Sequence, residues 1–76
     1  MAEPAILDAK GLRCPLPVLK ARKAMKVLPA GATLRVLATD PGAIKDFEAF
    51  CKTTGYRLVS MSQDGEVLTF DIQKAD

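Results

Sequence analysis

The amino-acid sequence predicts a small α/β protein whose four strands and two helices follow one another in the order βαβαββ. Two segments repeat apolar residues at the helical period and open beside prolines, whereas four shorter segments are rich in β-branched and apolar residues. The pair Asp64-Gly65 separates the last two of these segments and is typical of a two-residue hairpin turn. Two successive β-helix-β units cross over with the same right-handed sense, so both helices are expected on one side of the sheet.

The start and stop signals of each element set its predicted bounds. Proline in a first helical turn and glycine just past a last turn mark the ends of helices. The helices are therefore predicted from Pro15 to about Leu28 and from an Asp40 N-cap to about Thr53. The strands are predicted over residues 5–8, 33–38, 56–62 and 67–73. A chain of this length is expected to form a single domain over residues 1–76.

The helical period also predicts which side chains each helix buries. The apolar face of the first helix consists of Val18, Ala21, Ala24, Met25 and Leu28. The apolar face of the second helix consists of Ile44, Phe47, Cys51 and Thr54, with Phe50 at its edge. Cys51 is therefore expected to be an inert core thiol, and the alternative is a resolving cysteine that forms a disulfide with Cys14.

The other cysteine lies directly ahead of the first predicted helix. Cys14 is predicted to be the N-cap, with Pro15 as the first helical residue and Pro17 in the same turn. Because the prolines have no N–H group, Leu16 has the only amide in the first three helical positions that could donate to the sulfur. The sulfur is thus expected on a rigid and largely apolar rim.

Positive charge surrounds this cysteine in the sequence. A sulfur at a helix N-terminus feels the positive end of the helix dipole, and Lys10 and Arg13 add their own charge, so the thiolate of Cys14 is expected to be favoured. Cysteine is a poor N-cap compared with Ser, Thr, Asp or Asn, so a structural role alone does not explain its presence. A reactive thiol is therefore favoured over a structural one.

Charge is unevenly distributed along the chain, although the net charge is only +2. Residues 9–39 hold seven bases and no acid, whereas residues 40–76 hold seven acids and four bases. This positive field suits an acidic protein surface or an RNA, or it is a solvated helix face. Leu16 and Leu19 fall among the bases rather than on the buried face, which predicts an exposed docking patch. The patch consists of Leu16, Leu19, Lys20, Arg22 and Lys23.

Several kinds of chemistry are excluded by the residue types that are missing. The chain has no histidine, so it has neither a Cys–His pair nor a histidine base, and two cysteines alone cannot complete a zinc site. It also lacks a Cys-x-x-Cys pair and a glycine-rich phosphate loop, and no metal or cofactor is expected. Its few aromatic residues give little support to base stacking, so direct nucleic-acid binding is not expected.

The N-terminal residues and the cysteine content predict the compartment. The N-terminus is acidic and has no long apolar run, so neither a signal peptide nor a membrane span is expected. Two cysteines without a secretory signal favour the reducing cytoplasm.

The remaining chemistry is that of a lone activated thiolate with no general base beside it. Such a group is suited to accept and pass on an electrophile that needs no proton transfer. Sulfane sulfur meets this requirement: the thiolate takes the outer sulfur of a persulfide and later offers it to another thiol.

Residues around Cys14 and in several later parts of the sequence match the motifs of a known protein family in order and spacing. The run from Leu7 to Pro17 contains Cys14-Pro15-Leu16-Pro17, and further blocks follow at 19–24, 39–43, 46–47, 50–51 and 54–55. The chain thereby resembles the TusA/SirA-like sulfur-carrier family, whose signature is Cys-Pro-x-Pro at the start of the first helix. Tyr56 departs from the family pattern, since many members have a histidine at that position.

The resemblance implies an α/β two-layer sandwich, with both helices on one face of a four-stranded mixed sheet of order 1-2-4-3. The uncovered face of that sheet is expected to carry Ser60, Ser62 and Thr69.

The resemblance also implies a sulfurtransferase function, whether as a turnover enzyme or as a stoichiometric carrier. Cys14 would carry sulfur as a persulfide, receive it from a cysteine desulfurase or a rhodanese-type donor, and pass it to an acceptor protein. Across the family the acceptor pathways include tRNA thiolation, molybdenum cofactor assembly and sulfur oxidation. Two alternatives remain open from the residues themselves: a small RNA-binding module, and a redox or regulatory protein that pairs Cys14 with Cys51.

Overall fold

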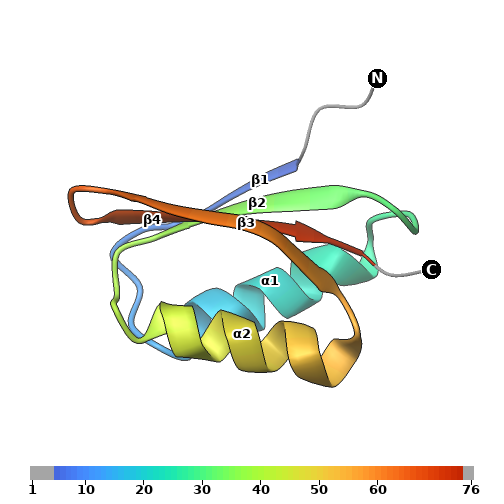
Figure 1. Cartoon of the computed structure of the whole chain (residues 1–76), viewed down its shortest axis with the longest axis horizontal. Helices are drawn as coiled ribbons and strands as arrows, with labels where there is room; N and C mark the ends of the chain where they lie inside the picture. The colour runs from blue at the N-terminus through green and yellow to red at the C-terminus, as the bar shows by residue number, and fades with distance from the viewer. Residues whose placement is uncertain (1–4, 75–76) are drawn as a thin grey trace.

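A computed structural model describes residues 5–74, and its elements follow the predicted order βαβαββ (Figure 1). The strands are β1 (Ala5–Ala9), β2 (Thr33–Ala38), β3 (Arg57–Asp64) and β4 (Val67–Gln73). The helices are α1 (Leu16–Lys26) and α2 (Ala43–Thr54). Every predicted element is present, and its ends lie within a few residues of the predicted ones.

The four strands form one mixed sheet in the order β1-β2-β4-β3, which confirms the expected topology. β1 pairs with β2 in parallel, and β4 lies antiparallel to both β2 and β3. Both helices lie on the same face of the sheet, with α1 beside α2 (Figure 1). Because β1 and β2 are parallel, the loops that follow them leave the sheet at the same edge.

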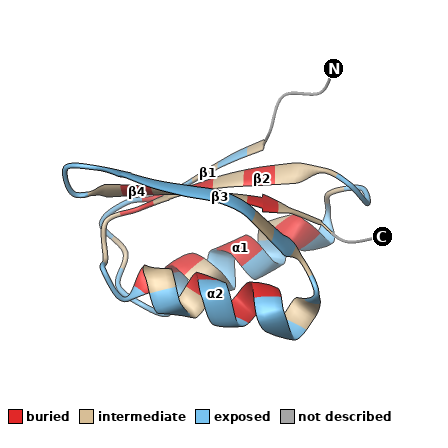
Figure 2. Ribbon diagram, viewed as in Figure 1, coloured by how far each residue is buried: buried red, intermediate tan, exposed pale blue. Residues whose placement is uncertain are grey.

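The core lies between the sheet and the two helices (Figure 2). The residues of β2 and β4 that face it are Leu34, Val36, Ala38, Leu68, Phe70 and Ile72. Ala21 and Met25 of α1 are fully buried against them, as the helical period predicts. Phe47 of α2 is also fully buried, and its ring stacks on that of Phe70 with 4.6 Å between the centroids. These contacts fix α2 against the middle of the sheet.

Phe50, predicted at the edge of the apolar face of α2, is buried. The ring of Tyr56 packs edge-on against it at 5.6 Å, and the guanidinium of Arg22 lies 5.7 Å from its centroid. Both covering groups come from outside α2, so the periodicity of that helix alone does not reveal them. Thr54 is only half-buried, and its hydroxyl donates to the Phe50 carbonyl over 2.7 Å.

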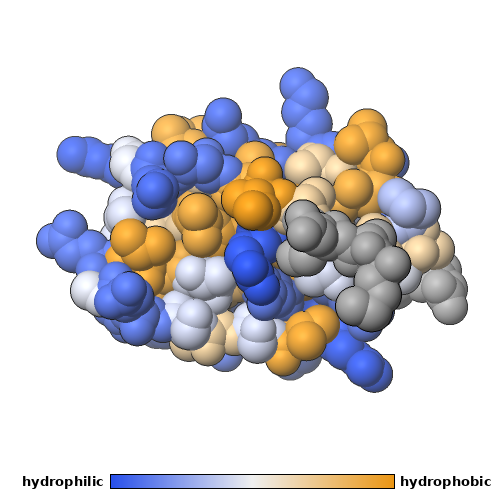
Figure 3. Space-filling view, turned by 90° about the horizontal axis from the view of Figure 1, so that it is seen from above, coloured by the Kyte–Doolittle hydropathy of each residue, from blue (hydrophilic) through white to orange (hydrophobic). Residues whose placement is uncertain are grey.

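The uncovered face of the sheet carries a polar network across three strands. Arg35 Nε donates to Asp71 Oδ1 over 2.8 Å, and Ser60 Oγ donates to Asp71 Oδ2 over 3.0 Å. Ser62 pairs with Thr69 on the same side, so the predicted solvent-facing residues lie where they were expected. Figure 3 shows hydrophobic patches on this face separated by hydrophilic side chains.

The last hairpin turns one residue later than the Asp64-Gly65 pair predicts. Asp64 pairs with Val67, so Gly65 and Glu66 form the two-residue loop. Gly65 adopts a φ of 62°, a left-handed conformation that favours glycine.

Both helices end near the predicted residues. α1 ends at Lys26 rather than near Leu28, because the N–H groups of Val27 and Leu28 bond to carbonyls only three residues back. α2 ends at Thr54, one residue after the predicted end, and the N–H of the following Gly55 donates to the Cys51 carbonyl over 2.9 Å. Neither helix within residues 5–74 is long and apolar enough to cross a membrane.

Candidate functional site

Cys14 lies in the loop between β1 and α1, where this loop meets the one between β2 and α2. Two hydrogen bonds join the loops. The Gly11 N–H donates to Thr39 Oγ1 over 2.9 Å, and the Cys14 N–H donates to Asp40 Oδ2 over 2.7 Å. The Cys14 side chain is exposed, so its sulfur is held by the backbone yet accessible to another molecule.

The start of α1 differs from the prediction by one residue. The N-cap is Pro15 and the first helical residue is Leu16, so Cys14 precedes the cap, and the Cys14–Pro15 peptide bond is cis. The Leu16 N–H donates to the Arg13 carbonyl over 2.8 Å and not to the sulfur. Pro15 is exposed beside Cys14, whereas Pro17 is buried against the core and forms no part of the rim.

The thiol of Cys14 donates a hydrogen bond to Asp46 Oδ2, a carboxylate in the first turn of α2. This bond is the main reason why the pKa of Cys14 is raised to about 11, and desolvation and the negative charges of Asp46 and Asp40 add to it. The predicted direction was therefore wrong. The hydrogen bond to Asp46 and the negative charges of Asp46 and Asp40 favour the thiol over the thiolate.

Asp40 is the carboxylate that binds the backbone of the Cys14 loop. Asp40 accepts hydrogen bonds from the N–H groups of Cys14 and Gly42, and these two bonds lower the pKa of the Asp40 carboxyl. The charge of Arg13 lowers it further. Lys10 is exposed, and its backbone N–H donates to Asp8 Oδ1 over 3.0 Å.

Gly42 leaves the space beside the sulfur open. Its φ of −63° is one that any residue adopts, so the glycine is not required by backbone conformation. A Cβ atom at this position would lie 3.4 Å from Cys14 Cβ, 3.7 Å from Cys14 Sγ and 3.3 Å from Asp40 Oδ1. An alanine Cβ would therefore touch the Cys14 side chain at ordinary contact distance and press on the Asp40 carboxylate, whereas a larger side chain would crowd the thiol.

Sequence reasoning missed three residues of this site: Asp40, Gly42 and Asp46. It assigned Asp40 the role of N-cap of the second helix, but the N-cap is Gly42, and Asp40 accepts from the Gly42 N–H in a turn just before it. One signal was available. The loops after two parallel neighbouring strands meet at one edge of a sheet, which brings residues after Ala38 close to Cys14.

The predicted docking residues lie on the outer surface of α1. Leu16 and Leu19 are 46% and 53% exposed, which confirms that they are not part of the core. Lys20 and Lys23 line a hollow of about 350 Å³ between α1 and β1. Arg22 instead lines a hollow of about 240 Å³ between α1 and α2, together with Asp46 and Phe50.

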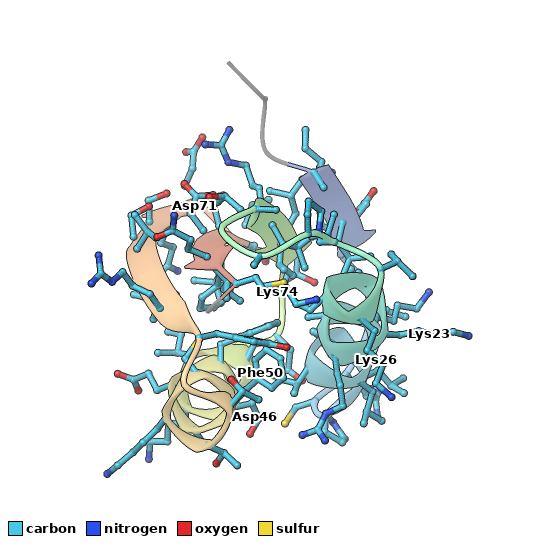
Figure 4. All side chains as sticks on the ribbon, turned by 90° about the vertical axis from the view of Figure 1, so that its right-hand side faces the viewer. Lys23, Lys26, Asp46, Phe50, Asp71 and Lys74 are labelled. Atoms are coloured by element: carbon cyan, nitrogen blue, oxygen red, sulfur yellow. The ribbon has the colours of Figure 1, made fainter. Side chains whose placement is uncertain are left out.

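The two hollows lie on opposite sides of the same helix. Figure 4 shows Asp46 and Phe50 on the side of α2 that faces α1, whereas Lys23 points away from α2. Leu16 and Leu19 line neither hollow, and we call these two exposed leucines the α1 ridge. The docking residues thus do not form one flat patch.

Cys51 is a core thiol, as predicted. It is 7% exposed, and its burial raises the pKa of its thiol. Cys51 lies nine residues beyond Gly42 along α2, and this distance amounts to about 13 Å in a helix. A disulfide needs Cα atoms within roughly 7 Å, so the geometry gives no support to a Cys14–Cys51 pair. Within residues 5–74, no group of three potential ligands is placed to hold a metal ion.

Comparison with known proteins agrees with this fold. A family model described as sulfurtransferase TusA matches residues 5–74. The chain belongs to the TusA sulfurtransferase family. The predictions of this family and of a role in sulfur transfer are thereby confirmed.

Similar TusA-family proteins cover nearly the same length. The sulfur carrier protein TusA of Allochromatium vinosum is 48% identical over 69 residues, which cover 91% of each chain. A putative sulfur carrier protein of Neisseria meningitidis serogroup A is 51% identical over 67 residues, which cover 88% of this chain and 90% of the relative. The crystal structure of a SirA-like protein from Desulfitobacterium hafniense superposes with a TM-score of 0.81 at 26% identity, covering 95% and 99% of the two chains.

Proposed function

We propose that this TusA-family chain carries sulfane sulfur as a persulfide on Cys14. The observation that supports this most directly is the contrast between its two thiols. Cys14 is exposed on a loop held by backbone hydrogen bonds, whereas Cys51 is buried in the core. An exposed Sγ can be approached in line by a sulfur on a second protein, whereas a buried Sγ cannot.

The exchange balances without an oxidant or a reductant. Cys14 Sγ forms a bond to the outer sulfur of a donor persulfide, and the bond between the two donor sulfurs breaks. The departing donor sulfur keeps the electron pair of that bond and ends with the proton that Cys14 gives up. One S–S bond replaces another, so the persulfide moves and the number of S–S bonds is conserved.

The partners follow from this chemistry. The donor is a protein that presents a persulfide, either a cysteine desulfurase or a rhodanese-type protein, and the acceptor offers a thiol. The curated relatives are named sulfur carrier proteins, which supports a relay between two partners. A thiol carrier of this kind works in a reducing compartment such as the cytoplasm, where Cys14 remains free.

The proposed function predicts that one sulfur atom is added to Cys14 alone. Intact-protein mass spectrometry after incubation with a cysteine desulfurase and cysteine should show a gain of one sulfur, removed by reductant. The gain is expected to be lost in Cys14→Ser and unchanged in Cys51→Ser, because Cys51 is buried. A rhodanese-type donor is the second arm. Failure with both donors, or a gain that persists in Cys14→Ser, would overturn the proposal.

The ridge on α1 predicts that partner docking depends on Leu19. Replacing this half-exposed leucine by glutamate should slow sulfur transfer from the donor protein about tenfold, which is the size of a modest interface hot spot. The thermal midpoint should stay the same, because the side chain is outside the core. Transfer is measured by mass spectrometry over time.

Val59→Glu is the matched control for this experiment. Val59 is also 53% exposed, but it lies on β3, far from the α1 ridge in the fold. Its replacement should leave transfer unchanged. Equal rates for Leu19→Glu and Val59→Glu would remove Leu19 from the docking surface.

A further inference from the structure

The exposed thiol of Cys14 faces a carboxylate rather than a cation. Its Sγ donates to Asp46 Oδ2 from the first turn of α2, and the Asp40 carboxylate lies beside it on the preceding loop. The charge of Arg13 lowers the pKa of Asp40, and the guanidinium of Arg22 lies 5.7 Å from the centroid of the Phe50 ring.

The contact between Cys14 and Asp46 exists in only one protonation state of the sulfur. A carboxylate accepts the hydrogen of a thiol, but it repels a thiolate, which carries the same charge and has no hydrogen to donate. The hydrogen bond therefore stabilises the unloaded cysteine as a thiol. Since the thiolate is the nucleophile, the same bond lowers the reactivity of the unloaded cysteine.

We propose that Asp46 gates Cys14: its carboxylate holds the unloaded sulfur as an unreactive thiol until a docked partner gives Asp46 another hydrogen-bond donor. When that donor, a cationic side chain or an N–H group of the partner, binds the carboxylate, the thiol loses its acceptor. The S–H bond then ionises, the sulfur keeps the electron pair, and the proton passes to water. The thiolate forms in the presence of the partner and is suppressed in its absence.

The hollow between α1 and α2 gives the partner a route to this carboxylate. Asp46 lines it together with Pro15, Val18 and Arg22, so a side chain that enters the hollow reaches Asp46 beside the exposed sulfur. The biological meaning of the gate rests on the proposed function. Its chemistry does not, since the reactivity of the thiol can be measured without any sulfur donor.

The gate predicts that Asp46→Asn makes Cys14 a better nucleophile at neutral pH. The asparagine is nearly the same size but carries no charge, so the pH midpoint of thiolate formation should fall by about one to two pH units. The thiolate fraction at pH 7.5 then rises by about ten- to a hundredfold. Each thiolate is less nucleophilic when its pKa is lower, so the rate of alkylation by iodoacetamide should rise about three- to tenfold.

The measurement is the pH profile of iodoacetamide alkylation and of thiolate absorbance, made in a Cys51→Ser background. Glu48→Gln is the matched control, because it removes one negative charge from an exposed position on the same helix, two residues from Asp46. Its profile should be that of the parent protein.

An unchanged midpoint in folded Asp46→Asn would overturn the proposal, and so would an equal shift in Glu48→Gln. Asp46→Ser, which also removes the charge, gives the same test if the asparagine variant does not fold. The outcome is separate from that of the proposed function. A shifted midpoint with no persulfide on Cys14 would support the gate and reject the sulfur carrier, and the reverse result would do the opposite.

Discussion

Replacing Phe47 with alanine is expected to lower the free energy of unfolding by about 3–5 kcal/mol. The side chain is fully buried, its ring stacks on Phe70, and it meets the ring of Phe50 edge-on at 6.3 Å. Truncation removes these contacts and leaves a cavity between α2 and the sheet. A small domain has a total stability of roughly 5–15 kcal/mol, so the variant should keep only a small margin.

Thermal and urea unfolding, followed by circular dichroism, measure this loss. For a domain of this size the midpoint temperature should fall by at least about 12 °C. Val27→Ala is the control, because this side chain is 84% exposed and its truncation should change the free energy by at most about 0.5 kcal/mol. A loss below about 1 kcal/mol in Phe47→Ala would show that the core repacks around the cavity and does not depend on this ring.

The helical and strand periods were sufficient to predict most of the fold. Ala21, Met25 and Phe47 are buried where the period places them, and Leu16 and Leu19 are exposed as expected. These residues are easy to predict because each helix packs against one surface, the sheet, and buries one stripe.

The main difference from the predicted fold occurs where a contact comes from outside the local segment. The N-terminus of α2 starts later than expected, because Asp40 bonds to the Cys14 N–H on another loop as well as to the Gly42 N–H.

The central residue of the candidate site was predicted from the sequence, but the residues around it were not. Cys14 stands out in the sequence, but charge counted along the chain predicted a positive surrounding for it. In the structure, the Cys14 N–H donates to Asp40 and the Cys14 thiol donates to Asp46, although these acids lie 26 and 32 residues further along the chain. Only the pairing of β1 with β2 brings the two loops together, and the local count contains no information about that pairing.

Filling the open space next to the Cys14 sulfur is expected to have the second large effect. Gly42→Val should slow the loading of sulfur onto Cys14 by about tenfold or more, because its Cβ lies in contact with the cysteine side chain and its methyl groups extend further. A displacement of a reacting atom by about 1 Å costs a comparable factor in many enzymes. Gly42→Ala should give a smaller decrease, since it adds only the Cβ.

The fold should tolerate both substitutions at Gly42, which separates a blocked site from an unfolded one. Alanine and valine adopt a φ of −63° without strain. A residue with a Cβ also has fewer conformations than glycine in the unfolded chain, so less conformational entropy is lost on folding. Iodoacetamide alkylation and sulfur loading should fall together in the order glycine, alanine, valine, while the unfolding midpoint changes little. Glu48→Val is the control, because it places a β-branched residue on an exposed face of α2. Sulfur loading onto Cys14 should be unchanged in this variant. If Gly42→Val loaded sulfur at the parental rate, the incoming sulfur would have to reach Sγ from a side that Gly42 does not border, and the hollow lined by Asp46 would be the remaining approach.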